Sequence, residues 1–473
     1  MSENNKNDEL QYDPQTGSLG ERLRRVKTTR WIRFGCVSAI FLGWVVWMQN
    51  PWLLLAWPLL ADIYLTQFIP WTWWKGLKNT AARTLMSWLD AIVYALVLVY
   101  FLFLFVGQNY QIPSSSLEKT LLTGDFLWVN KIVYGPRVPQ TPLHFPLAQN
   151  TLPFLNCKSY FDKPQLEYHR LKGLRSVERG DIVVFNFPAG DTVALKMQNP
   201  DYYALCQQLG RRTIWADKER FGEVIYRPVD RRENYVKRCL GLPGESLSIK
   251  NGVVHINGKA INQPEHVQFL YHVETNGQAI ATSVLDDLGI ALDDRMAFAD
   301  APGHYIFPLT NQMKTSLEAL PYVTLVERMP ADPADNMLTY PVGHDYGWTH
   351  ADYGPIWIPK KGATVKLTTE NLPLYERCIR NYERHTLEQR DGQILIDGKP
   401  ATQYTFEMDY YWMMGDNRDN SLDSRYWGFV PEDHIVGTPN IILISFDKDK
   451  SLFQGGIRWN RIFRIPNPDK GNI

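Results

Sequence analysis

Three consecutive serines, Ser114 to Ser116, lie in the stretch IPSSSLEKTLLTGD (residues 112–125), and Lys119 follows them. A serine hydroxyl is a weak nucleophile until a base takes its proton, and a lysine amine can be that base only when it is neutral. Because the reference pKa of lysine is ~10.4, the site must lower it by several units, which burial among apolar groups does. The stretch therefore suggests serine–lysine hydrolysis and raises the question of which serine and which lysine act together.

Ser116 and Lys119 fit the Ser-x-x-Lys motif of penicillin-recognising enzymes, in which the serine opens a helix and the lysine returns one turn later. Those enzymes also need Ser-Asp-Asn and Lys-Thr-Gly motifs, and neither tripeptide occurs in this sequence. We therefore discount Lys119 as the base.

Two further stretches favour another partner. In ENYVKRCLGLPGESL (residues 233–247), Lys237 lies in an apolar, strand-like run that ends in a Gly-Leu-Pro-Gly turn. In MMGDNRDNSLDSRYWGFVP (residues 413–431), glycine, aspartate, asparagine, serine and arginine crowd into a short span between apolar residues. Such density predicts a hydrogen-bonded loop, which is either only well ordered or part of a site.

Taken together, these stretches resemble the type I signal peptidases. Four motifs of that family occur in order, at residues 113–121, 180–185, 235–245 and 415–428, and the resemblance spans residues 110 to about 447. It implies that Ser116 is the nucleophile, that Lys237 is the general base, and that Ser114 helps to hold the oxyanion. Two positions depart from the family pattern: Leu117 replaces Met, and Lys119 replaces Pro, which puts the local turn shape in question.

The resemblance also implies supporting roles. Ser421 is expected to hydrogen-bond the lysine amine, and the surrounding loop is braced by Asp423, Arg425, Arg238 and Gly415. If residues 114–116 are extended, Ser114 and Ser116 face the same side and Ser115 points away. No metal and no cofactor is required.

The implied substrates are signal peptides of exported preproteins, cut after a small-x-small sequence and bound as an added strand. Ile112 and Pro113 are expected on one side of this strand, and Tyr235 and Val236 on the other. Shallow apolar pockets beside Leu117 and Leu121 are expected to admit only small side chains. The lipid bilayer and the export translocon are the other expected partners.

Three apolar runs precede these motifs, at residues 34–48, 51–69 and 89–107, and a bilayer-spanning helix needs roughly 20 such residues. We expect three transmembrane helices, although the short first run also allows two, and buried core helices are the alternative. Basic residues lie before the first run and within the 70–88 loop. They are Arg22, Arg24, Arg25, Lys27, Arg30 and Arg33, and then Lys75, Lys78 and Arg83. The positive-inside rule then predicts a multi-pass protein with a cytoplasmic N-terminus and with the chain beyond about residue 108 on the far side of the membrane. The resemblance implies that this membrane is the bacterial inner membrane and that the catalytic part is periplasmic.

Beyond residue 108 the pattern is typical of strands and hairpins, as in DIVVFNFP and NIILISFD. The fold expected is therefore N-terminal transmembrane α-helices followed by a mostly β soluble domain of antiparallel sheets. We expect a basic N-terminus (1–33), a membrane region (34–107), a first catalytic part (108–250), an enlarged second β domain (251–405) and a last catalytic part (406–473). Residues 251–265 and 391–405 echo one another, either as a repeat or as two ordinary hairpins with favoured turns.

The remaining features are less informative. Fifty Lys and Arg balance fifty Asp and Glu, so nothing indicates a nucleic-acid partner. The five cysteines lack CxxC spacing, and the four outside the apolar runs could be paired or free. His344 and His350 could bind a metal but are more typical of a surface loop. Alternative functions are a self-cleaving Ser–Lys repressor-type protease and a membrane-anchored binding protein with an inactive site.

Overall fold

The computed structural model describes residues 18–473 except 146, 153–154, 156, 189–191, 198–201, 298–300, 452–454 and 468–472. The chain divides into two compact units, Met1–Phe101 and Leu102–Ile473. All five cysteines are free thiols.

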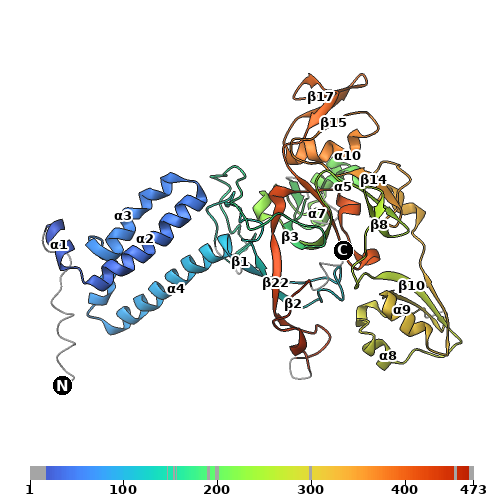
Figure 1. The fold of residues 1–473 in the computed structure, drawn as a ribbon, viewed down its shortest axis with the longest axis horizontal. Coiled ribbons are helices and arrows are strands. Elements are labelled where there is room, and N and C mark those ends of the chain that lie inside the picture. The colour runs from blue at the N-terminus through green and yellow to red at the C-terminus, as the bar shows by residue number, and fades with distance from the viewer. Residues whose placement is uncertain are drawn as a thin grey trace. The chain divides into compact units, whose positions relative to one another are not determined.

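The N-terminal unit is helical. Its elements are α1 (Leu19–Arg25), α2 (Thr28–Met48), α3 (Trp57–Ala61) and α4 (Thr80–Phe105), which extends past the unit boundary (Figure 1). Among the described residues, α2 and α4 are the two helices long and apolar enough to cross a membrane. The second apolar run forms only a shorter segment, Pro51–Thr66, in which α3 lies between a 3-10 turn and a π turn.

This shorter segment runs antiparallel to α2. The Trp57 ring packs 5.8 Å from that of Phe34, and its Nε1 donates to Ser38 Oγ at 3.1 Å. Arg30, near the start of α2, donates to the Ile63 carbonyl at 3.2 Å, near the end of the segment. Residues 28–66 therefore form a helical hairpin.

Asp62 closes the hairpin. Its carboxylate accepts hydrogen bonds from Thr66 Oγ1, the Phe68 N–H and Trp71 Nε1 at 2.5, 2.6 and 2.9 Å. The buried charge is thus satisfied by the turn that follows the segment.

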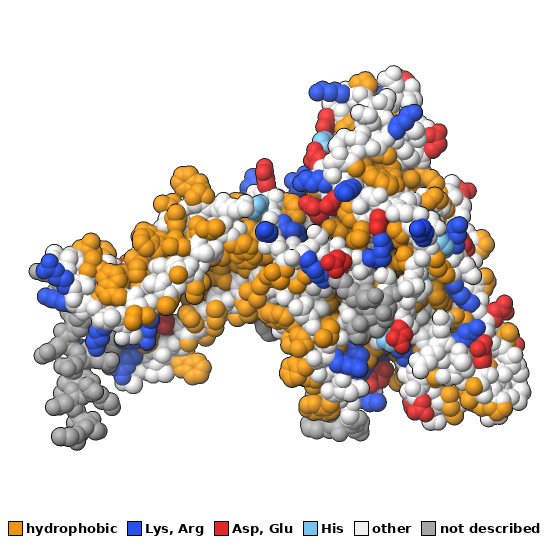
Figure 2. All heavy atoms as spheres, in the orientation of Figure 1, with side chains coloured by type: hydrophobic (Ala, Val, Ile, Leu, Met, Phe, Trp, Pro, Cys, Tyr) orange, Lys and Arg blue, Asp and Glu red, His pale blue; other side chains and the backbone are white. Residues whose placement is uncertain are grey.

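The surface of the N-terminal unit is largely apolar. Hydrophobic side chains cover much of the visible face of α2, α3 and α4 (Figure 2), and Ile40, Val46 and Trp88 are 74%, 76% and 68% exposed. A water-facing helix would bury such a stripe, so these helices are suited to a lipid environment.

The second unit, Leu102–Ile473, is called the soluble unit below. Its largest described sheet is antiparallel and has seven strands, in the order β1-β2-β22-β3-β6-β20-β21. Its strands come from both ends of the unit: β1 (Gly107–Gln111), β2 (Asp125–Asn130), β3 (Ile182–Asn186), β6 (Asn234–Gly241), β20 (Tyr410–Met414), β21 (Val430–Pro431) and β22 (Ile435–Ser445). Register shifts interrupt the β2–β22, β22–β3 and β20–β6 pairs, and such irregularities increase the local twist of a sheet.

Each of the two echoing stretches supplies the second and third strands of a three-stranded meander with two tight turns. One is β7 (Ser246–Lys250), β8 (Val253–Ile256) and β9 (Lys259–Ala260); the other is β16 (Leu387–Arg390), β17 (Gln393–Ile396) and β18 (Lys399–Pro400). Both turns of the first meander are Asn-Gly pairs and both turns of the second are Asp-Gly pairs. Every residue of these pairs has a positive φ, as type I′ turns require. β14 (Tyr353–Trp357) extends the first meander.

A separate four-stranded sheet, called the β10 sheet below, follows the first meander, in the order β11-β12-β10-β13. It comprises β10 (Phe269–Thr275), β11 (Met296–Ala297), β12 (His304–Leu309) and β13 (Val323–Arg328), and it packs with α8 (Thr282–Asp287) and α9 (Asn311–Glu318) around a core that includes Val273, Phe307 and Leu317.

Short elements complete the unit: β4 (Thr192–Ala194), α5 (Tyr202–Leu209), α6 (Arg211–Ala216), α7 (Lys218–Phe221), β5 (Val224–Tyr226), β15 (Thr364–Lys366), α10 (Leu372–Arg377), β19 (Gln403–Thr405) and α11 (Ser424–Trp427). The described helices here have at most eight residues, so the expected mostly β soluble part is confirmed.

Candidate active site

Ser116 and Lys237 lie together in the soluble unit. Lys237 Nζ donates a hydrogen bond to Ser116 Oγ at 2.5 Å, and the two residues are 7% and 4% exposed. Lys237 lies on β6, where it pairs with Val183 of β3, so the sheet fixes its backbone on that side. The pair is buried, in contact and rigidly supported.

Burial lowers the pKa of Lys237 to about 8, because an ammonium ion is poorly solvated there. The nearby carboxylate of Asp423 raises this pKa and the guanidinium of Arg425 lowers it, but both effects are smaller than that of burial. A substantial fraction of the amine is therefore neutral near pH 8.

A turn, not an extended segment, presents Ser116. The Glu118 N–H donates to the Ser115 carbonyl at 2.9 Å, and the Leu121 N–H donates to the Leu117 carbonyl at 2.7 Å. The extended geometry expected for residues 114–116 is thus wrong. Ser114 and Ser116 nevertheless line one cleft, which Ser115 does not line.

Lys119 occupies a conformation that proline cannot adopt. Its φ is +68°, whereas the proline ring holds φ near −65°. The departure from the family pattern at this position therefore accompanies a left-handed turn. Lys119 Nζ points away from the serine and donates to the Leu288 and Gly289 carbonyls at 2.9 and 2.6 Å.

The loop of residues 415–425 packs against the serine turn. The Asn417 N–H donates to the Ser116 carbonyl at 3.1 Å. A Cβ atom on Gly415 would lie 2.2 Å from Ser421 Oγ and 2.5 Å from the Ser116 carbonyl oxygen, so only glycine fits without movement. Ser421 is 5% exposed and lines the cleft, but its Oγ makes no hydrogen bond to a described residue, so the expected bond to the lysine amine is not formed.

Asp423 and Arg425 form a buried ion pair at the centre of this loop. Arg425 Nε and Nη2 donate to the two Asp423 oxygens, both at 2.8 Å. Asp423 also accepts the Gly415 N–H at 3.1 Å, and Arg425 donates to the Arg418 carbonyl at 2.5 Å. Burial raises the pKa of Asp423, but the adjacent Arg425 charge outweighs it and keeps the pKa low.

Arg238 makes a second buried pair, with Asp416. Its Nε and Nη2 donate to the Asp416 oxygens at 2.7 and 2.6 Å, and Thr120 Oγ1 donates to the same carboxylate at 2.7 Å. This carboxylate thereby joins β6, the 415–425 loop and the serine turn. Sequence reasoning had not singled out Asp416 or Thr120, although both lie in the quoted stretches. The available signal was that Arg238 was expected to brace the loop, which requires an acidic partner.

A cleft of about 600 Å³ opens beside the serine and lysine. Its lining includes four of the residues expected to bind substrate, Ile112, Pro113, Tyr235 and Val236. Leu117 and Leu121 do not line it: they are 1% and 0% exposed and pack in the apolar cluster with Ile112 and Val184, which support the cleft.

The edges of two strands are open at this cleft. β1 is the terminal strand of its sheet. β20 pairs only with the second half of β6, so residues 234–237 have no strand partner on that edge in the described chain. Both open edges contribute residues to the cleft lining, so an extended peptide has unpaired backbone groups to bind there.

His350 also braces the loop. Its ring lies between Asp335, which contacts Nδ1, and Asp419, whose Oδ1 is 3.3 Å from Nε2. Burial lowers the pKa of this imidazole, but the two carboxylates outweigh burial, so the pKa is raised. His350 is thus an ion-pair partner, and no metal cluster that includes His344 or His350 is found among the described residues.

Comparison with known proteins gives a consistent result. The family model described as signal peptidase, peptidase S26, matches residues 85–294 and 361–444 and leaves 295–360 unmatched. Signal peptidase I of Buchnera aphidicola subsp. Acyrthosiphon pisum is 24% identical over 366 residues, covering 76% of each chain. Signal peptidase I of Haemophilus influenzae is 24% identical over 382 residues, covering 80% of this chain and 74% of its own. Signal peptidase I of Aquifex aeolicus is 61% identical over 36 residues, which are 8% of this chain and 14% of its own.

Proposed function

Since the chain belongs to the S26 family of signal peptidases and is a serine endopeptidase that removes signal peptides, we propose that Ser116 and Lys237 form its catalytic dyad. The observation that carries this proposal is the 2.5 Å contact between Ser116 Oγ and a buried Lys237 amine whose pKa is lowered to about 8.

In the proposed mechanism, neutral Lys237 accepts the Ser116 hydroxyl proton as Oγ attacks the scissile carbonyl. The Ser116 N–H and the Ser114 hydroxyl donate to the resulting oxyanion, and one such donor is typically worth ~3–4 kcal/mol. The Lys237 ammonium then protonates the departing amine, leaving an acyl-enzyme. Lys237 next takes a proton from water, which hydrolyses the ester and restores Ser116.

The signal peptide binds in the proposed complex as a strand between β1 and residues 234–237 of β6. The two open edges at the cleft support this mode, because they offer unpaired N–H and C=O groups. Ile112, Pro113, Tyr235 and Val236 contact the strand, with Leu117 and Leu121 beneath. Selection for small side chains before the cut follows if the floor of the cleft is shallow.

Cleavage is proposed to occur at the outer side of the bacterial inner membrane. The helical hairpin of residues 28–66 supports this topology, because it returns the chain to the side on which the basic N-terminal segment lies. The basic loop at Lys75, Lys78 and Arg83 then remains inside, and α4 leads outward. The bilayer and the export translocon are the proposed neighbours.

The soluble unit is proposed to consist of a catalytic part (108–250 and 406–473) interrupted by a second β domain (251–405). The composition of the seven-stranded sheet supports this division, because its strands come only from residues 107–241 and 410–445.

The test is cleavage of a preprotein whose signal ends in Ala-x-Ala by the full-length chain in detergent. We expect Lys237→Ala and Ser116→Ala to abolish cleavage, while Lys119→Ala retains it as the matched lysine control. Cleavage at a near-normal rate by Lys237→Ala would overturn the dyad, although not the family membership.

A further inference from the structure

Three potential metal ligands lie on one face of the β10 sheet, which has the strand order β11-β12-β10-β13. Glu274 on β10 lies directly opposite His304 on β12, and His272 lies two residues before Glu274 on the same face. The alternate residues Tyr271 and Val273 point into the core. The side chains of His272, Glu274 and His304 are about one third exposed, so an ion from solvent can reach them.

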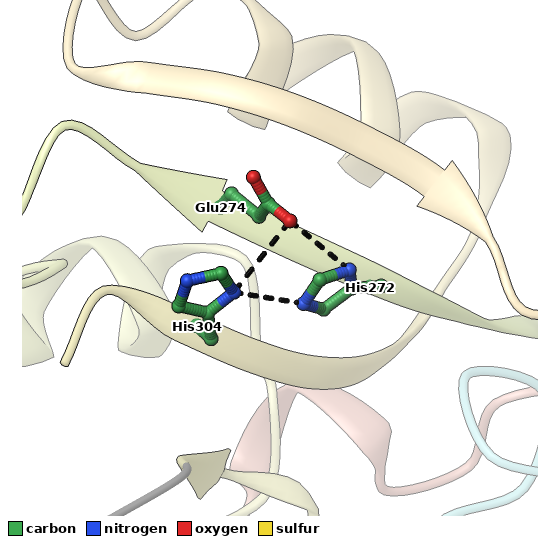
Figure 3. Close-up of side chains that lie close together, drawn as sticks. All are labelled: His272, Glu274 and His304. Carbon is green, nitrogen blue, oxygen red and sulfur yellow. Dashed lines mark hydrogen bonds and ion pairs between the residues drawn. The ribbon is translucent and has the colours of Figure 1, made fainter. Parts of the chain in front are cut away.

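The three side chains contact one another in a triangle (Figure 3). His304 Nδ1 lies 3.1 Å from His272 Nε2 and 3.6 Å from Glu274 Oε1, and Glu274 Oε1 lies 3.5 Å from His272 Nδ1. Ligands at ~2.1 Å around one tetrahedral ion are about 3.4 Å apart. Only one of the two His272 nitrogens can bind a given ion, and with one ligand atom taken from each residue the three atoms lie within 4.8 Å of one another. Side-chain adjustment would therefore bring them around a common centre.

Other histidine–carboxylate groups in the soluble unit have a different arrangement. Asp397 contacts Nδ1 of His385 and Glu407 contacts Nε2, so the two carboxylates lie at opposite nitrogens of one ring. His350 is held in the same way. His272 is likewise contacted at both ring nitrogens, but its two partners, His304 and Glu274, also lie 3.6 Å from each other. The three groups therefore close a triangle, and among the described residues they are the group of three whose ligand atoms lie within 4.8 Å of one another.

We propose that His272, Glu274 and His304 bind one Zn²⁺ ion. Two imidazole nitrogens and a carboxylate suit zinc better than magnesium or calcium, which prefer oxygen ligands. Water completes the coordination, and Glu327, opposite His272 on β13, is positioned on the same face.

The bound ion would cross-link β10 to β12, and β10 is directly bonded to the active-site loop. The Leu270 N–H donates to Asp419 Oδ2 at 2.7 Å, and the Gln268 N–H donates to the Asp416 carbonyl at 2.9 Å. His304 and β12 lie in the segment 295–360 that the family model does not match. One of the three proposed ligands therefore comes from the unmatched segment, and the other two come from matched residues.

The test is calorimetric titration of Zn²⁺ into the full-length chain, purified in detergent without a histidine tag and stripped with chelator. We expect one Zn²⁺ per chain, and affinity lowered roughly tenfold or more by His304→Ala and by Glu274→Gln, which keeps the side-chain shape. His255→Ala is the control, because this half-buried strand histidine bonds only the Val253 carbonyl in the described structure.

The proposal is wrong if the wild-type chain takes up no stoichiometric Zn²⁺, or if His304→Ala and Glu274→Gln bind it as tightly as His255→Ala does. Cleavage of the preprotein by each variant shows that it is folded. Because the titration measures binding alone, its failure leaves the proposed dyad untouched.

Discussion

Lys237 must be held in place by its surroundings and must also have a low pKa. These requirements usually conflict, because a carboxylate that binds a buried amine also keeps it charged. Asp423 is near enough to raise the pKa of Lys237, but it is bonded at both oxygens by Arg425. Burial therefore prevails and the pKa falls to about 8. The ion pair beside the proposed dyad braces the loop, and the low pKa of Lys237 is compatible with its proposed role as the base.

A pH dependence follows from this pKa. Below pH 8 Lys237 is increasingly protonated and cannot accept the Ser116 proton, so kcat/KM should rise with pH and level off above about 8. The measurement is kcat/KM for preprotein cleavage between pH 6 and pH 10. In Lys119→Ala, kcat/KM should rise over the same pH range. A shift of this pH range in Lys119→Ala would instead implicate Lys119 as the base.

At the residue scale, motif resemblance paired Ser116 with Lys237, and the structure places the two side chains in contact, whereas the chemistry of single residues did not select this pair. The nearer lysine in the sequence, Lys119, contacts carbonyls far along the chain, at Leu288 and Gly289. Such long-range contacts are set by tertiary packing and leave no local pattern. The same reason hid the Arg238–Asp416 pair.

At the scale of elements, the site is a close approach of two loops, the serine turn and residues 415–425. Gly415 allows this approach, because any Cβ there would meet Ser421 and the Ser116 backbone. We expect Gly415→Ala to displace the turn and to lower kcat/KM by roughly a hundredfold, as ~1 Å misplacements do. Gly43→Ala, where a Cβ meets nothing within 4 Å, is the control. Equal rates for the two variants would contradict the argument.

Lys119 ties the serine turn to the end of α8. Its ammonium donates to two carbonyls just beyond that helix, where a positive charge is also favoured. Losing these bonds should cost about 1–3 kcal/mol of stability while cleavage persists. Thermal unfolding followed by tryptophan fluorescence should show a lower Tm for Lys119→Ala than for Lys250→Ala, an exposed control. An unchanged Tm would mean that the hydrogen bonds of Lys119 to the Leu288 and Gly289 carbonyls do not stabilise the fold.

Strand patterns and turn dipeptides predicted the elements better than their contacts. The Asn-Gly and Asp-Gly pairs predicted both hairpins, because type I′ turns depend on local φ preference. The conformation of residues 114–116 was mispredicted, because packing of Asn417 against Ser116, not local alternation, sets it.

At the scale of the whole molecule, the apolar runs predicted helices but not their lengths. The second run is shortened because Asp62 and its bonds to Thr66 and Phe68 end the helical segment before the apolar residues do. Two long helices and a short return segment together still allow three passages, since the return segment runs antiparallel to α2.

The proposed topology makes a prediction about accessibility from the two sides of the membrane. Cys157 is an exposed free thiol of the soluble unit, and Lys78 is exposed in the basic loop before α4. In intact spheroplasts, a membrane-impermeant maleimide should label Cys157. In a Cys157→Ser, Lys78→Cys variant it should label position 78 only after permeabilisation, as mass spectrometry of the corresponding peptides can show. Labelling of position 78 without permeabilisation, or of Cys157 only after it, would mean that the short segment does not return the chain across the bilayer, and the catalytic unit would then lie inside.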